Sequence, residues 1–272
     1  MPKKVVADPS APTHIKSAAE KEVTQSIADA FNDAYDEIAN DVIEQYERQT
    51  TVGKIVEMLS FDAYESIADD LRKPLEAVFG DSGEDAVDKL SIHIDIDDHK
   101  DDLFDLVNED AKDYAHDRAA ELVGKKWVNG QLMDNPDSRW AINETTRDGL
   151  RSLIERAYSD GMTPAQLRKE IQSSYGFSKE RAQMIAKTEM TRASSEGTLS
   201  GWKNSGVVQG KEWIIGDDYD SNGDCDCGDN AEEGVIAIED AFGSGDDGPP
   251  NHPNCNCSMA ATLLEEGEEE AE

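Results

Sequence analysis

The four cysteines of this 272-residue chain form two pairs of the type Cys-x-Cys. The first pair, Cys225 and Cys227, lies in GDCDCGD, and the second pair, Cys255 and Cys257, follows His252 in PPNHPNCNC. Two short ligand pairs joined by a loop are typical of a structural zinc site, in which thiolate sulfur and imidazole nitrogen form a tetrahedron. The sequence therefore predicts a zinc site, with five candidate ligands for four positions.

Two other interpretations of this region stay open. The cysteines can be free thiols in a hairpin. Alternatively, DYDSNGDCDCGD places oxygen ligands at alternate positions, with Gly223 in sixth place, which is the spacing of a calcium-binding loop. A strand is expected before this loop instead of a helix, and an aspartate replaces the usual final glutamate. The candidate calcium ligands are Asp218, Asp220, Asn222, Asp224, Asp226 and Asp229.

The sequence contains no complete catalytic motif. The patterns G-x-S-x-G and H-E-x-x-H, the Walker motif and the dinucleotide fingerprint are all missing. Catalytic zinc needs an open coordination position and a nearby general base, and Pro253 and Asn254 follow His252 where a zinc deaminase would carry its glutamate. We therefore predict that the cysteine region is structural and that the chain is not an enzyme, with an enzyme of unrecognised type as the alternative.

The charge of the chain restricts its partners. Sixty acidic and 26 basic residues give a formal net charge of −34. Such a surface repels nucleic acid and anionic lipid headgroups, so we expect no direct nucleic-acid binding and no membrane association. The acidic excess predicts solvated helix faces, and the contacts of the protein are expected to be with other proteins.

The start of the chain, MPKKVVADPSAPTHIK, lacks the apolar run of a secretory signal. No stretch approaches the roughly 18 uninterrupted apolar residues of a membrane span. We therefore expect the protein to be made in a reducing cytosol, where clustered cysteines bind metal more often than they form disulfides.

The N-terminal half predicts long helices. Residues 1–14 are polar and contain several prolines, and we expect a flexible arm there. Residues 15–123 form an acidic helical region with an apolar stripe at three- and four-residue steps. Because the chain is only 37% hydrophobic, we expect a partner or a second copy to cover this stripe. SIHIDID, residues 91–97, alternates as a strand would, and a short extended link is the alternative. The stripe comprises Ile27, Phe31, Ala34, Tyr35, Ile38, Val42 and Tyr46.

A second region begins after residues 124–139, which are rich in Gly, Asn, Asp and Pro and are predicted to be a linker. A helix is expected from about Asp137 to Ser159, ending before Gly161, because glycine tolerates the left-handed turn at a helix C-terminus.

The next two helices have clear starting signals. Thr163, Pro164 and Gln166 have the types and spacing of a capping box with proline in the first helical position. Ser178 is expected to cap the following helix, SKERAQMIAKTEMTRASSEG. In that helix Glu189 and Arg192 are spaced to pair, and we predict that they form a polar clamp to the next element.

The end of the chain has a different character. KEWIIG predicts a strand, and the following segment is rich in Gly, Asp and Cys. Residues 261–272 are expected to be an acidic disordered tail. The predicted fold class is mainly α: a helical N-terminal region and an α+β C-terminal domain that contains a small β/knuckle element stabilised by metal.

Residues 140–260 resemble the phage Mu F-like minor head proteins, also called head morphogenesis proteins. The most specific piece of the resemblance is Pro-Pro-x-His-Pro-Asn-Cys-x-Cys at residues 249–257. Where this family tends to carry Cys-x-x-Cys, Asp224 stands in place of the first cysteine, which leaves a mixed ligand set open. The segments that carry the resemblance are TTRDGLRSLIERAYSDGMTPAQLRKEI, RAQMIAKTEMTRA, KEWIIGDD, IAIEDAFGSG and PPNHPNCNC.

The resemblance implies a structural protein of a tailed bacteriophage. It implies a place in the virion, inside the head near the portal, and in the host cytoplasm during assembly. The implied partners are the portal protein, the major capsid protein or both, with self-association possible in addition. A metal-binding helical interaction protein of the scaffold type is the alternative function.

Overall fold

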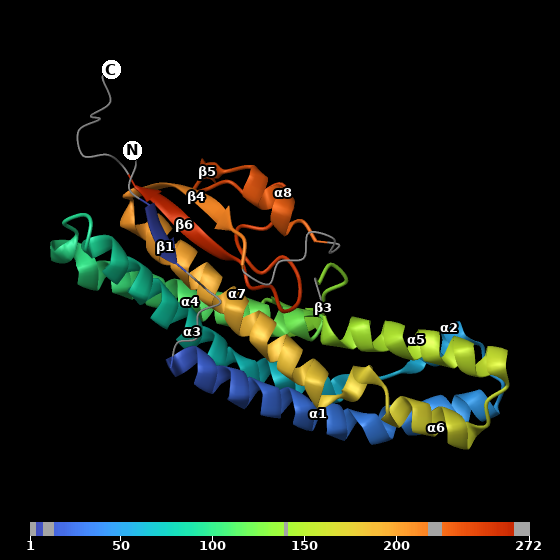
Figure 1. Cartoon of the computed structure of the whole chain (residues 1–272). Coiled ribbons are helices and arrows are strands. Elements are labelled where there is room, and N and C mark those ends of the chain that lie inside the picture. The colour runs from blue at the N-terminus through green and yellow to red at the C-terminus, as the bar shows by residue number, and fades with distance from the viewer. Residues whose placement is uncertain (1–3, 8–13, 139–140, 217–224, 264–272) are drawn as a thin grey trace. The chain divides into compact units, whose positions relative to one another are not determined.

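A computed structural model of the chain describes residues 4–7, 14–138, 141–216 and 225–263 (Figure 1). The mainly α class is confirmed, with eight α-helices and two small antiparallel sheets in this described part. The elements are β1 (Lys4–Ala7), α1 (His14–Glu47), α2 (Val52–Met58), α3 (Glu65–Ser91), α4 (Lys100–Leu122), β2 (Lys125–Val128), β3 (Gln131–Asp134), α5 (Ile142–Asp160), α6 (Pro164–Gln172), α7 (Lys179–Ser205), β4 (Val208–Ile214), α8 (Cys227–Glu232), β5 (Val235–Ala237) and β6 (Ser258–Leu263).

The chain divides into two compact units that are interleaved in sequence. The first unit comprises residues 1–20, 74–114 and 187–272, and the second comprises residues 21–73 and 115–186. Four helices, α1, α3, α4 and α7, contribute to both units. The predicted linker at 124–139 lies inside the second unit, so the compact units do not follow the composition of the sequence.

The apolar stripe of α1 is buried within the chain itself. Ile27, Phe31, Ile38 and Val42 have almost no exposed surface. Within the second unit, the Phe31 ring packs at 5.6 Å from the Tyr64 ring and at 6.4 Å from the Phe177 ring, between centroids. The expectation that a partner or second copy covers this stripe is therefore wrong, because residues far along the chain supply the apolar cover.

The predicted end of α5 and the predicted starts of α6 and α7 are confirmed, whereas α5 begins at Ile142 and not at about Asp137. Gly161 ends α5 in the left-handed conformation, with φ of 64°. Thr163 and Gln166 form a complete capping box at the start of α6, with Pro164 in the first turn. The Ser178 hydroxyl accepts a hydrogen bond from the Arg181 backbone N–H at 3.1 Å and so caps α7. The local sequence decides these ends because each signal acts within one helical turn.

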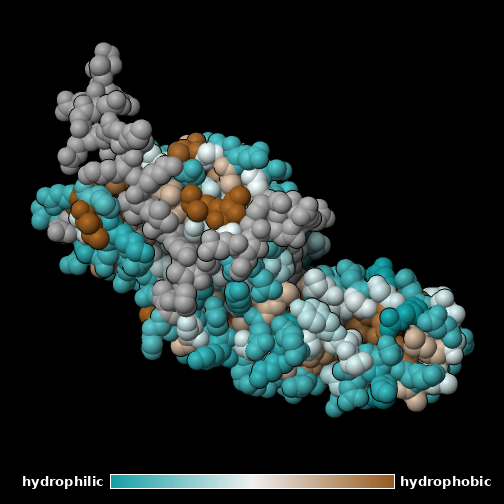
Figure 2. All heavy atoms as spheres, viewed as in Figure 1, coloured by the Kyte–Doolittle hydropathy of each residue, from teal (hydrophilic) through white to brown (hydrophobic). Residues whose placement is uncertain are grey.

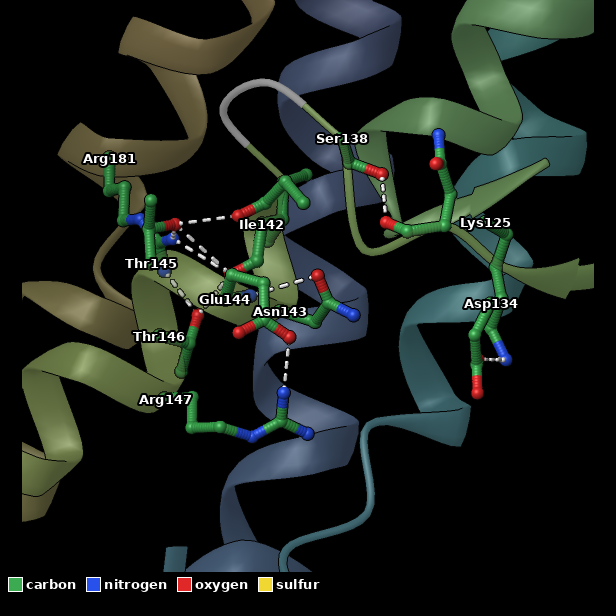
Figure 3. A network of polar contacts seen from close by, with 12 residues as sticks. Lys125, Asp134, Ser138, Ile142, Asn143, Glu144, Thr145, Thr146, Arg147 and Arg181 are labelled. Atoms are coloured by element: carbon green, nitrogen blue, oxygen red, sulfur yellow. Dashed lines mark hydrogen bonds and ion pairs between the residues drawn. The ribbon is translucent and has the colours of Figure 1, made fainter. Parts of the chain in front are cut away.

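The first turn of α7 places a buried arginine against the first turn of α5 (Figure 3). The Arg181 guanidinium donates to the Thr146 hydroxyl at 2.7 Å, to the Ile142 carbonyl at 3.1 Å, and also to the Thr145 hydroxyl and the Gly176 carbonyl. Burial lowers the pKa of Arg181, although the guanidinium keeps its charge because the ordinary pKa is so high. These neutral acceptors hold α7 and α5 together in the second unit.

The predicted linker contains a β-hairpin. Asn129 and Gly130, both with positive φ, form the turn between β2 and β3, which is the Asn-Gly signal of a tight hairpin. Lys125 forms an ion pair with Asp134 across the hairpin at 3.0 Å (Figure 3). A second ion pair joins Lys125 to Glu65 at 2.9 Å. The Asn and Gly residues of this segment therefore form the turn of a hairpin and do not indicate a linker.

The larger sheet belongs to the first unit and has the strand order β1-β6-β4-β5, with antiparallel pairs throughout. Lys4–Ala7 pairs with Met259–Thr262, where the sequence suggested a flexible arm for residues 1–14. Residues 261–263 complete β6 in the segment expected to be a tail. Both differences have one cause: strand pairing joins the two ends of the chain, and neither end alone carries that signal.

One face of this sheet packs against α7 (Figure 1). The apolar cluster between them includes Leu199 and Trp202 from α7, and Met259, Ala261 and Leu263 from β6. Trp202 is fully buried. This cluster is the main core of the first unit, and it fixes the sheet on which the cysteine region is built.

Within the first unit, α3 and α7 approach each other at backbone distance. A Cβ atom on Gly197 would lie 2.0 Å from the Phe79 carbonyl oxygen, and one on Gly201 would lie 2.5 Å from the Gly83 carbonyl oxygen. Real Cβ atoms do not reach such distances, so only glycine fits at these positions. The glycines of α7 are therefore required by packing, although glycine lowers helix propensity.

The strand predicted at residues 91–97 is wrong. α3 continues to Ser91, and the N–H groups of His93 and Ile94 then donate to the Leu90 carbonyl in a turn. Ile96 is buried in the main core of the first unit, whereas Ile92 is 77% exposed. The alternation of isoleucines thus comes from a turn at the end of a helix.

The visible surface is predominantly hydrophilic. Figure 2 shows hydrophobic residues on this face only as small separate patches among hydrophilic ones. No described helix combines the length and the apolar composition that a membrane span needs.

Candidate metal centre

Two segments of the first unit bring the cysteines together. Cys225 lies just before α8, and Cys227 is the first residue of that helix. Cys255 and Cys257 lie at the end of the loop that leads into β6. Because β4 pairs with β6, the segment after β4 and the segment before β6 lie at the same end of the sheet. The topology thus explains why residues distant in sequence form one site.

The thiols of Cys227, Cys255 and Cys257 form a buried group in which all three sulfurs lie within 4.8 Å of one another. The Cys227 and Cys255 sulfurs are 3.7 Å apart. Two thiolates on one tetrahedral zinc, each with a Zn–S distance of about 2.3 Å, have sulfurs about 3.8 Å apart. This spacing fits a metal ion, whose identity the geometry alone leaves open.

A second group shares Cys227 and adds the two remaining candidates. The ligand atoms of Cys225, Cys227 and His252 also lie within 4.8 Å of one another. Cys225 and His252 are both partly exposed, whereas Cys227 is fully buried. All five predicted zinc ligands therefore gather around Cys227, three of them in the interior and two nearer the solvent.

The buried thiols influence one another's ionisation. Hydrogen bonds from Cys227 and then from Cys255 lower the pKa of Cys257 to about 2. The Cys227 thiol donates to Cys255 and to Cys257, which raises the pKa of Cys227. One thiolate is thus stabilised by its two neighbours, and further ionisation is opposed by charge repulsion. A bound divalent cation would remove this opposition, since a coordinating thiol loses its proton outright.

His252 is held in one orientation by its own loop. Its Nδ1 atom lies 2.9 Å from the Pro253 carbonyl oxygen, an acceptor, and this contact favours the neutral tautomer with the proton at Nδ1 and the lone pair at Nε2. The Cys255 N–H donates to the His252 carbonyl at 3.1 Å and closes a turn between the two residues. Such a backbone hydrogen bond to the distal ring nitrogen is usual for a metal-binding histidine.

A polar network behind the cysteines links the two segments. The Asn251 side chain accepts from the Asp226 backbone N–H at 3.0 Å and donates to Asp246 at 2.9 Å. Ser244 donates to the same Asp246 carboxylate at 3.2 Å and accepts from the buried Asn230 of α8 at 2.9 Å. The backbone between Cys225 and Cys227 is therefore tied to the loop that carries His252, without any metal.

Helix α7 holds the same loop from its other side. Arg192 donates to the Pro250 carbonyl at 3.1 Å, and the Thr188 hydroxyl accepts from the Asn254 N–H at 3.3 Å. Asn254 is in the left-handed conformation, with φ of 59°. The sequence predicts a clamp from Glu189 and Arg192 to the next element. Arg192 instead holds α7 to the loop before β6, and the buried Glu189 lies one turn before Arg192.

The candidate metal centre lies in the part of the chain that matches a known protein family. Residues 148–260 match the model of the family described as Phage Mu protein F like protein. We call this matched part of the chain the Mu F-like region. The match begins in α5 and ends in β6, so it includes the five candidate ligands and the α7 clamp. No curated protein and no solved structure matches the chain.

Several supporting residues of the Mu F-like region are not predicted from sequence. Asn230, Asp246 and Asn251 read as ordinary loop residues because the chain is rich in Asp, Asn and Gly throughout this segment. Only the pairing of β4 with β6 brings them near the cysteines. A possible signal is Asn251 itself, which lies between a proline pair and His252 in PPNHPNCNC.

The Mu F-like region also buries a lysine beside the thiols. Lys211 of β4 is fully buried, with Nζ 3.7 Å from an Asp247 carboxylate oxygen and 5.6 Å from the Phe242 ring centroid. Burial lowers the pKa of Lys211, and burial raises the pKa of Glu196 on α7. Phe242 also packs edge-on against Trp213, next to the cysteines. We interpret this as an ion pair between a buried lysine and a half-exposed aspartate, and the Phe242 ring lies between the lysine and the cysteine core.

The calcium interpretation stays a prediction. Asp218, Asp220, Asn222 and Asp224 lie outside the described residues. Asp226 precedes α8, and Asp229 lies in its first turn. The Asp229 backbone carbonyl accepts the Glu233 N–H as a helical residue would.

Proposed function

We propose that this protein is a minor head protein of a tailed bacteriophage, which acts in procapsid assembly and head morphogenesis near the portal. The observation that carries the proposal is the Mu F-like region at residues 148–260. It supports a role in phage head morphogenesis, and the position near the portal and inside the virion is part of our proposal. The protein would be in the host cytoplasm during assembly.

We infer that the role is structural. The sulfurs of Cys227, Cys255 and Cys257 are buried under Trp213 and Phe242, which leaves little room for a substrate. A closed set of cysteine and histidine ligands is typical of structural zinc, whereas catalytic zinc keeps an open position. We propose zinc as the metal, held by four of the five candidates Cys225, Cys227, His252, Cys255 and Cys257.

The proposed partners are the portal protein, the major capsid protein or both. With a net charge of −34, the protein is expected to contact basic faces of its partners and to avoid packaged DNA. Charge complementarity of this kind increases association rates and selects partners.

A phage from which the gene is deleted tests this function. We expect coat protein to be made in normal amounts, while the yield of infectious, DNA-filled heads falls. Complementation with the intact gene should restore the yield, and immunoblots of purified virions should detect the protein. Normal yields of filled heads from the deletion would overturn the proposed function.

A further inference from the structure

We propose that a single zinc ion is held by Cys227, Cys255, Cys257 and His252, and that Cys225 is not a ligand. This inference rests on the proposed zinc and assigns its ligands. The three thiols form the buried group, and they lie within 4.8 Å of one another. The fourth ligand must then come from the solvent side, where both His252 and Cys225 lie near Cys227.

The His252 side chain is already oriented for metal binding before any metal is bound. Its ring is oriented by the Nδ1 contact with the Pro253 carbonyl, which leaves Nε2 free for a metal. Its backbone carbonyl is fixed by the Cys255 N–H, so the histidine and a buried thiol share one turn. For Cys225, by contrast, the described structure records no hydrogen bond to the thiol. Of the two candidates, His252 would lose less conformational freedom on binding.

The net charge of the site also favours His252 over Cys225 as the fourth ligand. Four thiolates on Zn²⁺ carry a net charge of −2, whereas three thiolates and a neutral imidazole carry −1. Asp226 and Asp229 flank Cys227 in the sequence, Asp246 accepts a hydrogen bond from Asn251 next to His252, and the chain has a net charge of −34. Because like charges at short range are costly in a partly buried site, the neutral histidine is the more favourable fourth ligand.

The proposed zinc would connect two segments of the Mu F-like region. Cys227 belongs to α8, and Cys255 and Cys257 lead into β6. His252 lies in the loop that Arg192 and Asn251 also hold. The apolar core at this end of the sheet is small and includes the cysteines themselves, so the metal would supply the cross-link that the core lacks.

The test uses the full-length protein, purified without added chelator, and four variants: Cys225→Ser, His252→Ala, His252→Cys and Cys255→Ser. Elemental analysis gives the zinc content, and replacement of zinc by Co²⁺ gives a thiolate-to-metal charge-transfer band whose intensity reports the number of thiolates. We expect the wild type to hold about one zinc per chain. Cys225→Ser should keep that zinc and the same band intensity.

The other variants separate loss of a ligand from loss of folding. His252→Ala and Cys255→Ser should both lower the zinc content well below one per chain. His252→Cys should retain metal and increase the cobalt band by about one third, because a fourth thiolate replaces the imidazole. Since that variant gains a signal, misfolding cannot imitate the result.

Three results would overturn the assignment. One is a weaker cobalt band in Cys225→Ser with full zinc in His252→Ala, which would identify four cysteine ligands. Another is a wild-type protein without zinc, and the third is two zinc ions per chain. None of these bears on the deletion experiment, so the failure of this inference is distinguishable from failure of the proposed function.

Discussion

Arg181 and the cysteine cluster are two buried polar groups that differ in the hydrogen-bond partners around them. The Arg181 guanidinium donates to two hydroxyls and two carbonyls, and its charge also lies 5.1 Å from the Phe31 ring centroid. The protein alone therefore satisfies this group. The three buried thiols, by contrast, have mainly one another, and such a set stabilises only one thiolate. The protein thus supplies all the partners of Arg181, whereas the cysteine cluster has a geometry that is compatible with a metal ion.

Removal of the proposed metal should produce the largest difference in stability between the cysteine region and the Arg181 network. We expect a strong chelator to abolish the protection of backbone amides in residues 225–257 against hydrogen exchange, because structural zinc contributes on the order of 10 kcal/mol in small zinc domains. Peptides from residues 142–186, which contain the Arg181 network, should keep their protection.

Hydrogen exchange followed by mass spectrometry checks this expectation, with re-addition of zinc as the control for reversibility. Equal loss of protection in both regions would show that the two do not differ in their dependence on metal.

A substitution at the close contact of α3 with α7 should have the second largest effect on stability. Gly197→Ala should lower the free energy of unfolding by about 3 kcal/mol, because the new methyl group would collide with the Phe79 backbone carbonyl. Gly149→Ala is the matched control: this glycine lies exposed on α5 with nothing within 4 Å of an added Cβ.

The control should increase the free energy of unfolding by about 0.5–1 kcal/mol, since alanine is the better helix former. Urea denaturation of the two variants measures both changes. A neutral Gly197→Ala would mean that the two helices can separate without cost.

Removal of the Arg181 side chain should have a smaller effect. Arg181→Ala removes the guanidinium that donates to the Gly176 carbonyl and to the Thr145 and Thr146 hydroxyls, and we expect a loss of about 2 kcal/mol in the free energy of unfolding. Arg151→Ala, an exposed position on α5, should change it by less than about 0.5 kcal/mol. Thermal denaturation monitored by circular dichroism measures the change in stability of both variants. Equal losses in both variants would contradict a role for the buried network.

Lys211→Met should have the smallest effect on the free energy of unfolding, and the size of this effect depends on pH. Because burial lowers the pKa of Lys211, the folded protein binds fewer protons than the unfolded chain between the lowered pKa and the ordinary value of about 10.4. Stability of the wild type therefore rises with pH through that window, and the cost of the buried charge is complete below it. Methionine avoids this cost, so we expect a gain of about 1 kcal/mol below the window.

The gain should shrink as the pH approaches the ordinary lysine pKa. Urea denaturation of the wild type and Lys211→Met at several pH values measures the trend. A variant that is less stable than the wild type at low pH would show that the pair with Asp247 contributes more than desolvation costs.

The sequence itself determined the helix ends and the chemistry of the site. The capping box at Thr163, the glycine at Gly161 and the cap at Ser178 act through hydrogen bonds and backbone angles within one helical turn, so they could be predicted without the fold. The five candidate metal ligands could also be recognised, because two Cys-x-Cys pairs and a histidine are rare in so acidic a chain. The structure brings all five together around Cys227.

Only the tertiary structure decided how distant segments pair. β1 pairs with β6 across almost the whole chain, and α1 finds its apolar cover in Phe177 and Tyr64. The requirement for glycine at Gly197 depends on the Phe79 carbonyl of another helix, and Asn251 becomes a support only when β4 pairs with β6. These features depend on contacts between residues far apart in sequence, whose energy appears only after the chain has folded, so local patterns do not encode them.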